Sequence, residues 1–152
     1  MIADVKKSKL AGRIYAATLF LITLTGFGQM PIFKRYYIAD IPGFGWLAEF
    51  YITHSIHYMT ASVLLALAGY WTVDFLAGRS QGITLTRLGK IKAALILGLV
   101  VTGGMMVVRN LSGVYFSHAA IHLMNLLHLG FCMALLTVSG VTLFTRTPWL
   151  ER

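Results

Sequence analysis

Apolar residues fill four long stretches of the chain, and charged residues stand almost only between them. Residues 14–33 and 50–73 carry no charge, residues 93–108 form a shorter charge-free run, and residues 110–145 form a longer one. A helix needs about 20 apolar residues to cross a membrane. The runs are continuous rather than alternating, which disfavours the strands of a membrane barrel. The pattern predicts four spanning helices, over about residues 12–33, 50–74, 91–109 and 113–145.

Composition agrees with a membrane protein and excludes two other classes. Hydrophobic residues make up 57% of the 152 residues and charged residues 12%, whereas a soluble domain has about 25% charged residues. A disordered chain would need low hydrophobicity and high charge. The single cysteine, Cys132, excludes an internal disulfide. We therefore expect an all-α fold, an integral membrane four-helix bundle in which residues 1–152 form one domain without a visible internal repeat.

The net charge of +8 sets an expected orientation rather than a nucleic-acid partner, because the basic residues punctuate the apolar runs instead of forming one stripe. Lys and Arg prefer the cytoplasmic side of a membrane protein. Ten of the 13 lie before or at the start of the first span, between the second span and the start of the third, or after the fourth: Lys6, Lys7, Lys9, Arg13, Arg79, Arg87, Lys90, Lys92, Arg146 and Arg152. This distribution predicts a multi-pass membrane protein, in contact with lipid, with both termini cytoplasmic and the loop over residues 29–49 outside.

All five histidines lie in two of the predicted spans. His54 and His57 are in the second, and His118, His122 and His128 are in the fourth. Polar side chains inside a membrane are costly and usually functional. The alternative is that they only form hydrogen bonds between helices or lie at a wet helix end.

The expected depth of each histidine in the membrane can be compared between the second and the fourth span. At 1.5 Å per residue, a second span that enters at Phe50 puts His57 roughly 10 Å deep. A fourth span that enters near Gly113 puts His122 roughly 13 Å deep and His128 roughly 22 Å deep. His54 and His118 lie nearer the surface. His57 and His122 therefore match best, with His118 next, and His128 is the candidate if the fourth helix begins later.

Two neutral imidazoles from facing helices are what a six-coordinate haem iron needs. A di-metal site would call for Glu-x-x-His pairs, and no carboxylate lies within the four charge-free runs. A zinc protease would need His-Glu-x-x-His, which the sequence lacks. A closed zinc site of four histidines is uncommon. The pattern thus favours haem iron bound axially by His57 and His122, with His54, His118 and His128 as alternative ligands.

The chain resembles the four-helix cytochrome b subunits of membrane-bound formate dehydrogenases and nickel–iron hydrogenases. The resemblance rests on Leu-Thr-Gly-Phe at residues 24–27 with Pro31 after it, on His57 followed by Ala61 and a leucine-rich run to residues 70–71, and on the further histidines of the last span. It implies two b-type haems, an iron–sulfur or cytochrome redox subunit as partner, and electron exchange with a quinone.

Two departures from that family alter the expected number of haems. The family's first helix normally carries a histidine shortly after an arginine, and here Arg13 is followed by Tyr15 and Ala16. Its last helix carries two histidines fourteen residues apart, and here Cys132 stands fourteen residues after His118. We therefore expect one haem b, on the outer side, with two haems as the alternative.

The resemblance also implies a quinone site, and two polar residues suit the implied ligands. Asn125 lies within one turn of His128, although an asparagine also bonds to neighbouring helices. Arg109 stands at the outer edge, where its fork could bind haem propionates or simply mark the membrane boundary. The expected function is a haem b anchor that relays electrons between a partner subunit and the quinone pool, as a non-catalytic part of an oxidoreductase. The alternatives are a haem-free anchor or assembly subunit, and a small metal or proton transporter that uses the histidine cluster.

The charge distribution yields a test of topology. A reporter enzyme fused after Arg152 should report the cytoplasm, and one inserted near Pro42 should report the outside, because ten of 13 basic residues fall on the first side. Activity measurements with a paired cytoplasmic and periplasmic reporter check both positions. The opposite pattern would place the histidine-bearing helix ends on the other membrane face.

Overall fold

The computed structural model describes residues 9–78 and 82–151 and is dominated by helices. Four of the described helices are long and apolar enough to cross a membrane: α1 (Lys9–Gly28), α3 (Phe50–Gly78), α4 (Arg87–Val108) and α5 (His118–Thr145). The expectation of an all-α chain with four candidate spans is confirmed. These helices indicate a multi-pass membrane protein.

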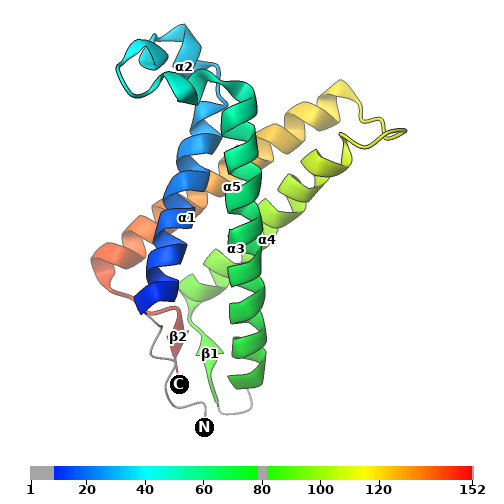
Figure 1. Cartoon of the computed structure of the whole chain (residues 1–152). Coiled ribbons are helices and arrows are strands. Elements are labelled where there is room, and N and C mark those ends of the chain that lie inside the picture. Colours follow the sequence, from blue (N-terminus) through cyan, green and yellow to red (C-terminus); the bar gives the residue numbers. More distant parts are fainter. Residues whose placement is uncertain (1–8, 79–81, 152) are drawn as a thin grey trace. The chain divides into compact units, whose positions relative to one another are not determined.

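The helices pack in two pairs, each of which is a compact unit (Figure 1). In the first hairpin, α1 packs along α3, and the connection between them carries α2 (Ile32–Arg35), η1 (Ile38–Asp40) and η2 (Gly45–Ala48). In the second hairpin, α4 packs along α5. Two short strands, β1 (Thr84–Leu85) and β2 (Leu150–Glu151), also belong to the second hairpin.

The first span ends earlier than its apolar run predicted, at Gly28 rather than residue 33. Leu47, which is 1% exposed, packs where a side chain at residue 28 would lie. A Cβ at Gly28 would stand 3.2 Å from the Leu47 carbonyl oxygen. Pro31 then begins the short helix α2, and the backbone before a proline disfavours the α conformation. The connection thus closes over the end of α1.

The last span also begins later than predicted, at His118 rather than near Gly113. Ser117 is its N-cap, and the Ser117 hydroxyl accepts a hydrogen bond from the Ala120 N–H at 3.2 Å. Gly113 lies before this cap with a φ of 82°, in the left-handed region that favours glycine. The depth of each histidine on α5 is therefore counted from His118.

The remaining two spans extend beyond their predicted limits. Helix α3 continues to Gly78 instead of residue 74. Helix α4 begins at Arg87 instead of residue 91, because the Thr86 hydroxyl caps it by accepting from the Gly89 N–H at 3.0 Å. Both extensions lie at the ends of their hairpins, outside the parts that carry the histidines.

In the second hairpin, the strand before α4 pairs with the strand after α5. Thr84 pairs with Glu151 and Leu85 with Leu150 in an antiparallel register. The neighbouring Thr86 N–H donates to the Trp149 carbonyl at 3.1 Å. These strands lie outside the four candidate spans, so they leave the prediction of helical spans intact.

A buried lysine strengthens this end further. Lys92 is 3% exposed, donates a hydrogen bond to the Thr142 hydroxyl, and lies 4.6 Å from the ring centre of Trp149. A cation over an indole face is stabilised by the ring quadrupole. Lys92 is thus buried against Thr142 of α5 and against Trp149, which directly precedes the C-terminal strand.

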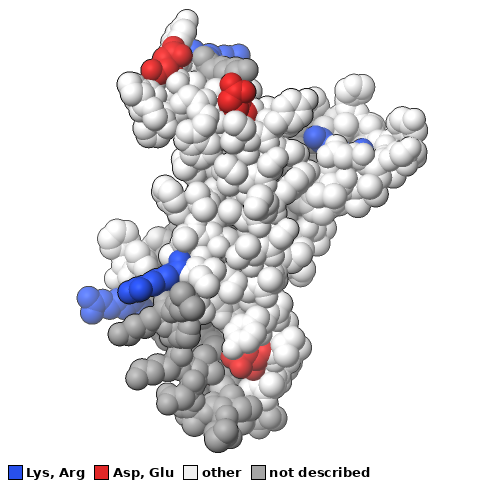
Figure 2. Space-filling view, in the orientation of Figure 1, with Lys and Arg blue, Asp and Glu red and all other residues white. Residues whose placement is uncertain are grey.

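Large apolar side chains cover the outside of both hairpins. Phe20 is 65% exposed on α1 and Leu126 is 68% exposed on α5. In Figure 2 the visible surface along the helices is white, and charged atoms gather toward the helix ends. Exposed apolar surface of this extent requires lipid or a partner helix to cover it.

The closest helix contact in the second hairpin is made at Gly98 and gives a test of packing. A Cβ at Gly98 would lie 2.8 Å from Cε2 of Phe131, whereas a Cβ at Gly104 would meet nothing within 4 Å. Gly98→Ala should lower the free energy of unfolding by about 1–3 kcal/mol through overpacking. Gly104→Ala, the matched control on the same helix, should leave it equal or raise it through helix propensity. Thermal unfolding in detergent compares the two, and equal effects would contradict this helix pairing.

Candidate functional site

His57 of the first hairpin is held by a buried threonine of the opposite helix. Its Nδ1 lies 3.1 Å from Oγ1 of Thr25, a residue that is 0% exposed. The Thr25 hydroxyl also lies 2.7 Å from the Leu21 carbonyl and 3.3 Å from the Ile22 carbonyl. A threonine hydroxyl has only one proton to donate. Because the helix carbonyls take that proton, the Thr25 oxygen accepts from the Nδ1–H of His57.

His128 of the second hairpin is held in the same way. Its Nδ1 lies 2.8 Å from Oγ1 of Thr102, which is 5% exposed. The Thr102 hydroxyl donates to the Gly98 carbonyl at 2.7 Å, with the Leu99 carbonyl at 3.3 Å. The proton count again makes Nδ1–H the donor. In both hairpins the neutral imidazole therefore has Nε2 as its basic nitrogen.

A glycine beside each threonine makes room for the imidazole. A Cβ at Gly26 would lie 3.3 Å from Cε1 of His57, and one at Gly103 would lie 3.4 Å from Cε1 of His128. A methyl group at either position would therefore be crowded against the imidazole ring. Each hairpin thus carries a Thr-Gly pair on its first long helix and a histidine against that pair on its second. The sequence was expected to show no internal repeat, but this local arrangement occurs in both hairpins.

His54 has a different environment. Its Nδ1 lies 3.0 Å from Oε1 of Gln29, whose Nε2 donates to the Thr25 carbonyl at 3.3 Å. The ring stacks on Phe50, with centroids 4.9 Å apart, and lies 4.3 Å from the ring of Tyr58. His54 therefore links the helix end to the connection through an amide and two aromatic rings of its own helix.

His118 and His122 are exposed on α5. Among the described residues neither has a hydrogen-bond partner or a ring contact. His118 is the first residue of α5, so at 1.5 Å per residue His122 lies about 6 Å from the helix start and His128 about 15 Å. His57 lies about 10 Å from the start of α3. The depth argument that preferred His122 over His128 depended on a start near Gly113, and it no longer separates them.

The other predicted site residues lie on the surface or at a helix end. Arg109 is half-buried directly after α4, and its N–H donates to the Met105 carbonyl at 3.0 Å. Asn125 is exposed on α5 and makes no hydrogen bond with another described residue. Gly130, two residues after His128, does not make a close contact like those of Gly26 and Gly103, since a Cβ there would meet nothing within 4 Å.

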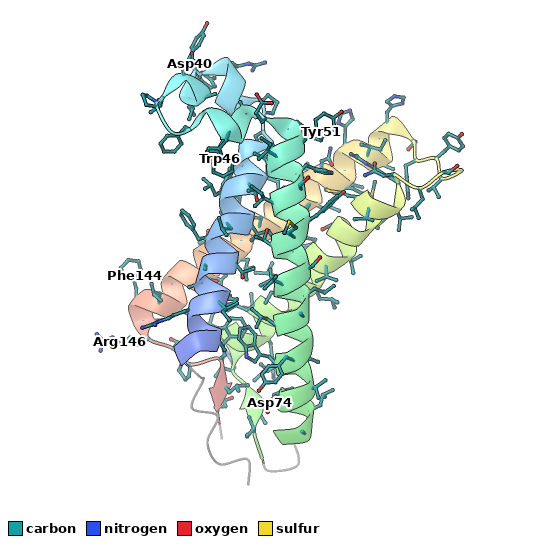
Figure 3. The ribbon with its side chains drawn as sticks, in the orientation of Figure 1. Asp40, Trp46, Tyr51, Asp74, Phe144 and Arg146 are labelled. Atoms are coloured by element: carbon teal, nitrogen blue, oxygen red, sulfur yellow. The ribbon has the colours of Figure 1, made fainter. Side chains whose placement is uncertain are left out.

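The carboxylate of α3 lies well away from His57 along the helix. Figure 3 shows Asp40 in the connection and Asp74 toward the other end of α3. Asp74 follows His57 by 17 residues, which is about 25 Å along the helix. Among residues 9–78 and 82–151, no three His, Cys, Asp or Glu side chains come together in a way that could hold a metal ion. The di-metal and zinc alternatives therefore gain no support within either hairpin.

Comparison of the chain with protein-family models, curated proteins and solved structures gives no match.

Proposed function

We propose that this chain is a haem b-binding membrane subunit, without catalytic activity of its own, that relays electrons between a partner redox subunit and the quinone pool. One observation carries the proposal: each hairpin holds a histidine, inside a helix long and apolar enough to span a membrane, whose Nδ1–H is bound by a buried threonine hydroxyl.

The residues fit a haem by the chemistry of their donor atoms. Axial imidazoles bind iron as neutral rings through one nitrogen, while the other nitrogen donates to a fixed acceptor that orients the ring. Thr25 and Thr102 supply such acceptors. Gly26 and Gly103 leave the rings close to a neighbouring backbone instead of a side chain. When bound, haem b supplies reversible one-electron transfer.

The rest of the chain would hold the group and exclude water. Apolar helices surround the histidines with low dielectric, which is one of the levers on redox potential. Arg109, at the end of α4, has a guanidinium fork that suits propionate carboxylates. Ligation by two histidines leaves no open coordination position, which suits electron transfer rather than oxygen chemistry. We expect one haem per chain, with His57 and one histidine of α5 as ligands.

The partners in this proposal follow from surface chemistry and from the resemblance to cytochrome b subunits. Exposed apolar side chains along α1 and α5 suit lipid, a quinone tail or a partner's helix. The exposed amide of Asn125 offers a donor and an acceptor on the apolar surface of α5. With both termini cytoplasmic in a prokaryotic inner membrane, the helix ends nearest the histidines face the periplasm, where an iron–sulfur or cytochrome subunit would dock.

Absorbance spectra of a matched histidine pair test the proposal. The purified wild-type chain should show a b-type band in the reduced-minus-oxidised spectrum and one haem per chain. His57→Ala should lose the haem or convert it to a high-spin form, because one axial ligand is gone. His54→Ala, the control one turn away, should keep a low-spin spectrum because its ring is bound by Gln29 and stacked on Phe50.

Each rival function predicts a different result. A haem-free anchor shows no b-type band after haem-replete expression, and a metal or proton transporter binds zinc or moves protons without one. Loss of the low-spin signal in His54→Ala with retention in His57→Ala would shift the ligand by one turn. No change in either variant would remove α3 from the site.

A further inference from the structure

We infer that the connection of the first hairpin, residues 29–49, is a folded element that lies in the headgroup layer of the membrane and inserts aromatic and aliphatic side chains into it. Its partner is the lipid surface. The inference concerns residues of the first compact unit alone, and it holds whether or not the chain binds haem.

The connection exposes large apolar side chains within a short stretch of chain. Tyr37 is 73% exposed, and Tyr36, Ile41 and Phe44 are exposed as well. A patch of exposed apolar side chains marks a surface that another apolar phase covers. Tyrosine is enriched at the boundary between membrane and water, because its ring suits the apolar side and its hydroxyl suits the polar side.

The backbone of the connection bonds its own polar groups. Its turns are closed by hydrogen bonds from the N–H of Tyr36 to the Ile32 carbonyl (3.1 Å), Asp40 to Tyr37 (3.0 Å), Ile41 to Ile38 (3.2 Å), Phe44 to Ile41 (3.0 Å), Leu47 to Phe44 (3.0 Å) and Glu49 to Trp46 (3.2 Å). A loop in water can leave these groups to the solvent, whereas a segment near hydrocarbon must pair them internally. The connection is therefore built to tolerate a water-poor layer.

Tyr37 carries a backbone strain that its turn does not require. Its φ is 56°, in the left-handed region, where glycine avoids the steric cost that a bulky side chain meets. The Tyr37 side chain makes no hydrogen bond or ring contact with another described residue. Nothing within the described hairpin thus repays the strain. Insertion of the ring into the membrane boundary would repay it.

Continuity with the apolar surface of the spans selects lipid as the partner. The connection is held against the ends of α1 and α3 by Leu47, whose side chain fills the space beside Gly28. Directly after it, Phe50 and Tyr51 are exposed in the first turn of α3, which is a candidate span. The exposed aromatic side chains therefore run from the connection onto a helix surface that lipid covers.

Two labelled residues give the connection an expected direction. In Figure 3, Trp46 lies on the side of the connection nearer the helices, and Asp40 lies at the end farther from them. An indole suits the membrane boundary and a carboxylate suits water. Asp40 is thus the natural reference for a water-exposed position on the same element.

The charges of the connection indicate that aromatic insertion, and not attraction to anionic headgroups, holds it in place. Residues 29–49 contain two basic and two acidic residues, so their formal charges cancel. Anionic lipid attracts clusters of basic residues. We therefore expect the depth of the connection to be the same in neutral and in anionic membranes.

The test places spin labels on the full-length chain in nanodiscs of phosphatidylcholine, alone or mixed with phosphatidylglycerol. Tyr37→Cys, Phe44→Cys and the control Asp40→Cys are each labelled in a Cys132→Ala background, since Cys132 is the single cysteine. The readout is the ratio of collisions with oxygen, which concentrates in the bilayer, to collisions with a water-soluble nickel chelate. We expect a higher ratio at residues 37 and 44 than at residue 40, unchanged by phosphatidylglycerol.

A second measurement keeps Cys132 and needs no label. Tyr37→Trp and Asp40→Trp each add one indole to the wild-type chain, and lipids brominated on the acyl chain near the carbonyl quench an indole that enters the membrane. The emission added at residue 37 should be quenched, and the emission added at residue 40 should persist.

Two results overturn the inference. Collision ratios at residues 37 and 44 equal to that at residue 40, without quenching at residue 37, would place the connection in water, where its surface would suit a protein partner. Protection of residues 37 and 44 from both oxygen and the nickel chelate would mean that protein covers them. The haem content of the chain enters neither result, so the inference fails or stands separately from the proposed function.

Discussion

A threonine hydroxyl can donate only one hydrogen bond, and at two positions of this chain it donates that bond to a backbone carbonyl of its own helix. At Thr25 and Thr102 the proton goes to the carbonyl one turn earlier, at 2.7 Å in each case. The oxygen is then an acceptor only, and the histidine of the opposite helix must donate to it. In a region that lacks water, an unpaired Nδ1–H would cost several kcal/mol. The direction of this hydrogen bond makes Nε2 the ring nitrogen that carries the lone pair in each neutral imidazole.

Close packing of the two long helices in each hairpin brings the threonine within hydrogen-bonding distance of the histidine. Gly26 and Gly103 let the imidazole rings lie against the backbone of the partner helix, and Gly98 receives the ring of Phe131. Small residues at helix contacts are the usual means of association where lipid removes the hydrophobic driving force. The same glycines that allow the helices to approach therefore also bring a hydroxyl within hydrogen-bonding distance of each histidine.

Sequence patterns predicted the four long apolar helices well because span length depends on a simple average over many residues. The four spans and the two helices that carry the histidines followed from charge-free runs and composition. Helix ends were less predictable, since single residues decide them: Ser117 caps α5 where Ser112 and Gly113 had suggested its start. That shift removed the depth argument for His122.

The Thr–His contacts could not be predicted because they depend on which helices pair and on their rotation. The sequence does contain a signal for these contacts, because Thr-Gly occurs in both the first and the third span. Only the pair at residues 25–26 was part of the resemblance to cytochrome b subunits.

The proposed function requires that the chain binds haem b through histidine imidazoles. Low-temperature electron paramagnetic resonance of the oxidised wild-type protein, combined with a haem count per chain, tests it most directly. We predict a single low-spin signal of the bis-imidazole type, one haem per chain, and no high-spin component. A haem-free chain, or a high-spin signal that marks an open axial position, would contradict the account.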